Sequence, residues 1–136
     1  MRPKKKVLLI DSEEDRLSIL SFTLKVRGYA VRGVSDPAIA IDEVVNWDPE
    51  LAIVVKPGSS FDLRKFFAEF AKVSPEMSTL LLSDNTLQSY ASATLPSTVS
   101  PATLLERVRM LVARKRGPRK ILVGTVRPEI ALEKTA

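Results

Sequence analysis

The chain has 136 residues, of which 45% are hydrophobic, and a formal net charge of +5 at neutral pH. This length and apolar content suffice for one folded domain with its own core. The chain contains neither cysteine nor histidine, which excludes a disulfide framework and thiolate chemistry and removes the commonest general base and zinc ligand. No apolar run approaches the roughly 18 residues of a membrane span, so we expect a cytoplasmic protein without a membrane segment.

The positive charge is concentrated at the ends of the chain. Residues 7–106 hold 8 basic and 14 acidic side chains, whereas residues 107–120 hold seven basic and no acidic ones. This distribution predicts an acidic folded body with a basic final helix and tail. We place the domain at residues 1–116 and a basic tail or linker at residues 117–136.

The first predicted elements are a strand and a helix that meet at an acidic cluster. The apolar residues 7–10 stop at Asp11, and such a short continuous run predicts a strand buried on both faces. Ser12 stands where a helix N-cap belongs, and the acids after it suit the positive end of the helix dipole. In an open α/β sheet, sites are built where such strands end. The helix has one apolar stripe at i, i+3 and i+7, formed by Leu17, Leu20 and Leu24.

The next segments continue the alternation of helix and strand. Gly28 predicts the end of the first helix, and residues 30–34 are typical of a second strand. Pro37, directly after Asp36, predicts the start of the second helix. We assign the buried stripe of this helix to Ile41, Val44 and Val45.

The second half of the chain completes the pattern. Residues 51–55 are continuously apolar, which predicts a central strand. We place a third helix at residues 62–72, a fourth strand at residues 78–82 and a fifth at about residues 91–95. The last helix begins at Pro101. This order predicts an α/β fold with a doubly wound five-stranded parallel sheet and right-handed crossovers.

Four short stretches carry a resemblance to a known family. They read VLLIDSEE at residues 7–14, SDP at residues 35–37, PELAIVV at residues 49–55 and LPSTVSP at residues 95–101. In this series, and in the order of its elements, the chain resembles a response regulator receiver (CheY-like) domain. The resemblance implies a flavodoxin-like fold and a non-enzymatic role in two-component signal transduction.

The resemblance also places the phospho-acceptor pocket of the family on this chain. The two adjacent acids that hold magnesium correspond to Asp11 and Ser12, and the acceptor aspartate corresponds to Val55. The hydroxyl position is kept by Ser83, whereas the lysine position falls on Ser97. Valine offers no carboxylate nucleophile, and Asp11 alone is only a weak candidate for metal binding. We therefore expect a pseudo-receiver with a vestigial pocket, no cofactor and no phosphoryl transfer.

The resemblance further identifies an interaction face around the last helix. Ser97 lies only 14 positions after Ser83, so we expect the family's fourth helix to be short or missing. Apolar surface of the last helix would then be uncovered, and such patches mark interaction sites. We predict a homodimer or a complex with a protein partner through a face with an apolar centre and a basic rim. Its residues are Thr94, Leu105, Arg109, Val112, Arg114 and Lys115.

Three other functions remain open from the sequence. The basic residues 107–120 would let a nucleic-acid-associated regulator contact phosphates. A conventional phospho-accepting regulator would need an acceptor other than Val55. An unrelated flavodoxin-like domain would bind a small molecule. A phosphorylation-independent interaction module accounts best for the residues at positions 55 and 97.

Overall fold

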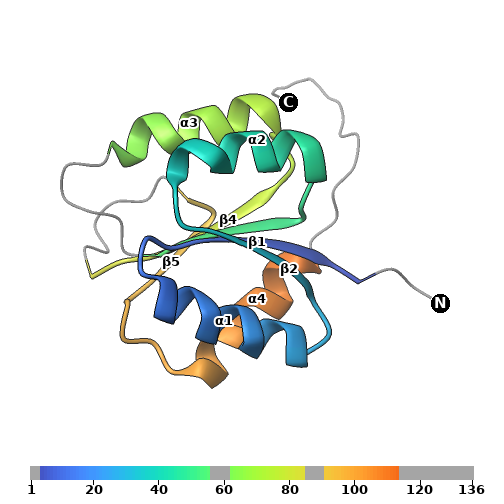
Figure 1. Cartoon of the computed structure of the whole chain (residues 1–136), viewed down its shortest axis with the longest axis vertical. Helices are drawn as coiled ribbons and strands as arrows, with labels where there is room; N and C mark the ends of the chain where they lie inside the picture. Colours follow the sequence, from blue (N-terminus) through green and yellow to red (C-terminus); the bar gives the residue numbers. More distant parts are fainter. Residues whose placement is uncertain (1–3, 56–61, 85–90, 114–136) are drawn as a thin grey trace, which may run out of the picture.

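Five parallel strands form one sheet in the order β2-β1-β3-β4-β5 in the computed structural model, which describes residues 4–55, 62–84 and 91–113. The strands are β1 (Lys6–Ile10), β2 (Ala30–Val34), β3 (Leu51–Val55), β4 (Ser78–Leu82) and β5 (Ala93–Leu95). The helices are α1 (Glu14–Val26), α2 (Pro37–Trp47), α3 (Leu63–Val73) and α4 (Pro101–Val112). Helices α1 and α4 cover one face of the sheet, and α2 and α3 cover the other (Figure 1). The predicted doubly wound α/β fold is confirmed.

The described residues between β4 and β5 form no helix, so the helix that follows β5 is α4. Residues 85–90 of this connection lie outside the described part of the chain. None of the helices within the described ranges is long and apolar enough to cross a membrane.

Alternate side chains of the central strand β3 enter two different cores. Ile53 and Val55 pack on the side of α1 and α4, together with Val108. Ala52 and Val54 pack on the side of α2 and α3. Because helices cover both faces, every residue of β3 is buried, which explains its continuously apolar sequence.

The boundaries of the helices follow local backbone chemistry. The Asp36 carboxylate accepts the Ala38 amide at 2.9 Å, and the Ser100 hydroxyl accepts the Thr103 amide at 3.2 Å. Each satisfies an amide that the helix itself leaves unpaired. Gly28, just past the end of α1, has a φ of 95°, a conformation that costs glycine little. The predicted starts of α2 and α4 and the predicted end of α1 are confirmed.

The start of α1 differs from the prediction that Ser12 is its N-cap. The residue before the helix is Glu13, whose side chain makes no capping hydrogen bond, and Ser12 lies outside the helix. The Asp11 carboxylate instead accepts the Glu13 amide at 3.0 Å. The assignment of Ser12 was wrong because a side chain one residue earlier, held at the end of β1, already satisfies the first amide.

The buried stripe of α2 also differs from the sequence assignment. Ala40 and Val44 face the sheet, and Ile41 is half-buried beside them. Val45 is 59% exposed, because one further residue rotates its side chain about 100° around the helix axis. The prediction that Val45 belongs to the core is wrong.

Strand β5 is shorter than predicted. Just before it, hydrogen bonds that involve side-chain hydroxyls take the place of backbone–backbone bonds to β4. The Ser92 amide donates to Thr79 Oγ1 at 2.8 Å, and the Thr79 amide donates to Ser92 Oγ at 3.0 Å. Ser92 is therefore tied to β4 without being part of a strand, and regular pairing begins only at Ala93.

Gly33 of β2 lies where α1 approaches the sheet. A Cβ atom at this position would lie 3.0 Å from Leu17 Cδ1 and 3.3 Å from Ser21 Oγ. We expect Gly33→Val to lower the free energy of unfolding by about 1–3 kcal/mol through overpacking, as measured by urea denaturation. Ser35→Val, at an exposed position beyond the strand, is the control and should change stability by less than about 0.5 kcal/mol. Equal stabilities of the two variants would contradict the close packing of α1 on β2.

Candidate functional site

The residues predicted for the pocket lie at one edge of the sheet, where the parallel strands end. The strand register pairs Ile10 with Val54 and Val55 with Leu82, and β5 ends beside Leu82 as well. Asp11 and Ser83 each follow directly after their strands, so the structure brings Asp11, Val55 and Ser83 to the same edge. This edge is the usual location of a site in a doubly wound sheet.

Asp11 is a buried charged group at this edge, with a relative exposure of 1%. Arg16, from the first turns of α1, binds both of its oxygens: Nε lies 2.5 Å from Oδ2, and Nη2 lies 2.7 Å from Oδ1. The Asp11 amide donates to the Val34 carbonyl at 3.1 Å, which fixes the residue against β2. A two-pronged guanidinium–carboxylate pair is short, directional and stronger than a neutral hydrogen bond. The Arg16 guanidinium therefore already neutralises the Asp11 carboxylate.

Arg16 is a site residue that sequence reasoning missed. Its Nη1 also lies 2.9 Å from a Glu13 carboxylate oxygen. The hydrogen bonds to Asp11 hold the pKa of Arg16 above its ordinary value, although burial acts in the opposite direction. The available signal was a lone basic residue in the acidic first turns of α1, where the helix dipole alone disfavours a positive charge.

Val55 ends β3 with a relative exposure of 4% and belongs to the core on the side of α1 and α4. Its side chain has no group that can act as a nucleophile or as a metal ligand. The position that the resemblance assigns to the phospho-acceptor is therefore apolar and closed to water.

The two serines of the predicted pocket belong to the connections after β4 and β5. The Ser83 amide donates to the Leu95 carbonyl at 3.0 Å. The Ser97 hydroxyl donates to Asp84 Oδ1 at 2.5 Å. These bonds link the end of β4 to the end of β5. They place a hydroxyl at position 97, where a lysine would have supplied a positive charge.

The described side chains of this edge do not fit a magnesium ion. Magnesium takes oxygen ligands in near-octahedral geometry, normally with one or two carboxylates. Both oxygens of Asp11 are bound by Arg16, and Ser12 is exposed and adds no carboxylate. Within residues 4–55, 62–84 and 91–113, no group of three or more acidic side chains gathers in a way that could hold a metal ion.

The predicted interaction face is only partly supported by the packing of α4. Val112 is 6% exposed and lies in the core, so its assignment to the interface is wrong. Leu105 is half-buried and packs against the same core, and Thr94 is half-buried in β5. The helix turns Val112 toward the sheet because it lies four residues after Val108, which is fully buried.

The basic rim of the predicted face has one described member. Arg109 is exposed and pairs with Glu106 on the preceding turn, with Nη2 at 2.5 Å from Oε2. Arg114 and Lys115 lie outside the described residues, as do the tail 117–136 and five of the seven basic residues in the segment 107–120 proposed to contact nucleic acid. Those expectations remain predictions.

A second apolar stripe on α1 faces solvent and was not foreseen. Ile19, Phe22 and Val26 are 65%, 69% and 65% exposed, whereas the stripe of Leu20 and Leu24 packs toward the sheet. The spacing i, i+3 and i+7 places the three exposed residues on one side of the helix. The same spacing was visible in the sequence, but an amphipathic helix usually has one apolar stripe.

Comparisons with known proteins agree on the fold. No protein-family model matches the chain, and no curated protein sequence matches it. A CheY-like response regulator receiver domain protein from Methanospirillum hungatei superposes with a TM-score of 0.73 at 19% identity, over 81% of this chain and 94% of its own. The non-phosphorylated HemR receiver domain from Leptospira biflexa gives 0.74 at 14% identity, over 85% and 99%.

A third similar structure is that of a complex. Response regulator TrrA from Thermotoga maritima, in complex with Mg²⁺ and BeF, superposes with a TM-score of 0.70 at 18% identity, over 79% of this chain and 98% of its own. At these identities the likeness concerns the arrangement of the backbone. The chain has the fold of the CheY-like response regulator receiver domains, with the sheet order β2-β1-β3-β4-β5.

Proposed function

We propose that this chain is a receiver-type signalling module that acts through protein–protein contacts and does not accept a phosphoryl group. The receiver fold supports a role in signal transduction. The proposal that no phosphoryl group is accepted rests on one observation: the Arg16 guanidinium binds both oxygens of Asp11, at the same edge as the apolar Val55. The chain is accordingly a binding protein and not an enzyme.

Phosphoryl transfer to a carboxylate requires three groups that this edge does not provide among its described residues. Val55 supplies no nucleophile. A magnesium ion would have to displace Arg16 from Asp11, which exchanges one cation for another at the same oxygens. Ser97 supplies a hydroxyl where positive charge would stabilise the transferred group.

The arrangement favours a fixed conformation over a switched one. Arg16 ties α1 to the end of β1 without any bound ligand. The module would therefore present the same surface at all times, with its partner's binding regulated elsewhere. The exposed apolar stripe of α1 supports the binding role, because contiguous apolar residues on a protein surface commonly mark an interaction site.

Beryllium fluoride and acetyl phosphate with magnesium test the proposal directly. We expect no change in the amide NMR spectrum and no rise in melting temperature, because a ligand that binds the folded state would stabilise it by mass action. We also expect no phosphoryl adduct by mass spectrometry. A receiver domain with an intact acceptor aspartate serves as the positive control. An adduct that maps to Asp11 or Asp84 would overturn the proposal.

A further inference from the structure

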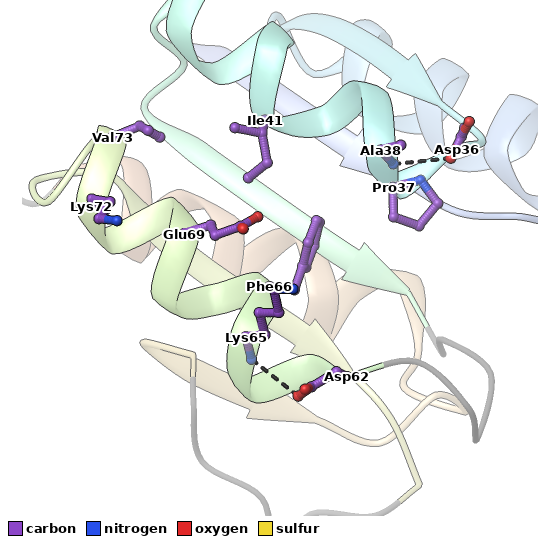
Figure 2. A pocket seen from close by; sticks show the side chains of 10 residues that line it. All are labelled: Asp36, Pro37, Ala38, Ile41, Asp62, Lys65, Phe66, Glu69, Lys72 and Val73. Atoms are coloured by element: carbon purple, nitrogen blue, oxygen red, sulfur yellow. Dashed lines mark hydrogen bonds between the residues drawn. The ribbon is translucent and has the colours of Figure 1, made fainter.

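A cleft of about 750 Å³ lies between α2 and α3. Figure 2 shows Ile41 of α2 and Phe66 of α3 pointing toward each other across it. Pro37 and Val73 continue the apolar lining toward its two ends, and Val73 is 39% exposed. Because α2 and α3 cover the face of the sheet opposite α1 (Figure 1), the cleft lies on that face.

The two ends of the cleft differ in charge. Asp36 and Asp62 cap the starts of α2 and α3 and lie at one end, whereas Lys72 lies at the other (Figure 2). Each aspartate uses Oδ1 to accept a helix amide, and among the described residues neither carboxylate pairs with a cation. Lys65 lies in the first turn of α3 beside Asp62, and Glu69 lies one turn before Lys72 (Figure 2).

Helix α1 has the complementary surface. Its exposed residues Ile19, Phe22 and Val26 follow the i, i+3 and i+7 spacing by which a helix fills a groove. Asp15 extends the same side toward the start of the helix, and Lys25 lies in its last turn. The helix therefore has an acidic start, an apolar middle and a basic end.

We propose that α1 of a second copy of this chain docks in the cleft between α2 and α3. In the antiparallel orientation, Lys25 of one copy meets Asp36 and Asp62 of the other, and Asp15 meets Lys72. Phe22 then enters the middle of the cleft. The parallel orientation would bring like charges together at both ends.

Length and dipole direction agree with this orientation. The stripe from Ile19 to Val26 and the lining from Phe66 to Val73 each cover seven helical steps, or about 10 Å at the helical rise. The negative C-terminal end of α1 would lie beside the positive N-terminal ends of α2 and α3, which is favourable.

The contact is head-to-tail, because α1 and the cleft lie on opposite faces of one sheet. Each copy can then use both surfaces, so the association continues beyond a dimer. A single docked helix is small beside a standard interface of about 800 Å² per partner. The association should therefore be weak, concentration-dependent and weakened by salt.

Sedimentation of the full chain at concentrations up to about 1 mM detects self-association with a Kd as weak as about 1 mM. We expect an average mass that rises past that of a dimer with concentration. A mass that stays at the monomer, or that stops at the dimer, would overturn the head-to-tail arrangement.

Two variants separate the surfaces. Phe22→Glu disables the stripe and Val73→Glu disables the cleft, and both positions are exposed, so folding should persist. Each variant alone should remain monomeric, whereas their mixture should form a one-to-one dimer and nothing larger. Ile39→Glu, at an exposed apolar position of α2 that does not line the cleft, is the matched control and should still assemble. A mixture that remains monomeric, or a control that fails to assemble, would contradict the proposal.

Charge exchange provides an independent check. Asp15→Lys and Lys72→Glu should each weaken the association about two- to fivefold, as expected for exposed ion pairs, and the double variant should regain it. Absence of recovery would rule out the antiparallel orientation.

The inference rests on the proposed role as an interaction module, and the two fail in different ways. A persistent monomer would remove the self-association and leave the phosphorylation-independent role intact. A phosphoryl adduct would remove that role and leave the sedimentation result unaffected.

Discussion

Val55→Asp is expected to destabilise the fold by about 3–5 kcal/mol without creating a phospho-acceptor. The side chain lies in the core on the side of α1 and α4, where an unpaired carboxylate is costly and is held protonated instead. The free energy of unfolding, measured by urea denaturation, reports the loss. Val55→Thr is nearly isosteric and uncharged, so it is the matched control and should lose about 1–3 kcal/mol.

The destabilisation by Val55→Asp should depend on pH. Burial raises the pKa of the introduced carboxyl above its value of about 3.9 in the unfolded chain. Between these two pKa values the folded state binds more protons than the unfolded state, so stability falls as pH rises. The difference from the natural protein should be smallest below pH ~4 and largest near neutral pH. An unchanged melting temperature together with phosphorylation by acetyl phosphate would show that our interpretation of this edge is wrong.

Arg16→Ala is expected to destabilise the fold by about 2–4 kcal/mol, toward the lower end for a buried pair because the arginine itself is 34% exposed. The loss arises because Asp11 would remain buried without its cation. Removal of one partner of a buried pair costs more than removal of both. Thermal and chemical unfolding of the variant measure the effect.

A double-mutant cycle isolates the pair. Arg16→Ala and Asp11→Asn are measured singly and together, and the double variant should be more stable than the sum of the single losses predicts. Arg32→Ala breaks a more exposed pair with Glu43, joined by one contact of 2.9 Å, and its loss should be below about 1 kcal/mol. Additive losses of stability in the cycle, or equal losses for Arg16→Ala and Arg32→Ala, would contradict a strong buried ion pair between Arg16 and Asp11.

Much of the fold could be predicted from the sequence, because it depends on residues that are close to one another along the chain. The bounds of β2, β3 and β4 coincide with the predicted strands. For β3 the reason is that it is buried on both faces, and such a strand is apolar throughout. Pro37 and Pro101 mark the starts of α2 and α4 and Gly28 the end of α1, since these residues act through their own backbone conformations. The parallel direction of β1 to β4 follows from the helices that connect them.

Only part of the candidate site could be predicted from the sequence. The sequence placed Asp11, Val55 and Ser83 at the ends of strands, and parallel topology brings such ends to one edge. It did not pair Asp11 with Arg16, because an ion pair over five residues depends on how the chain turns from β1 into α1. In that same turn the Asp11 carboxylate accepts the Glu13 amide, and Glu13 rather than Ser12 precedes the helix.

The sequence by itself determined the alternation of strands and helices, the parallel sheet and the apolar residue at position 55. Only the tertiary structure decided which helix surfaces are covered. Periodicity sets which side chains share a side of a helix, but the neighbours that cover that side come from distant parts of the chain. Val112 is buried by the sheet, whereas Phe22, in an equally regular stripe, is left facing solvent. For the same reason the cleft between α2 and α3 exists only once both helices lie on one face of the sheet.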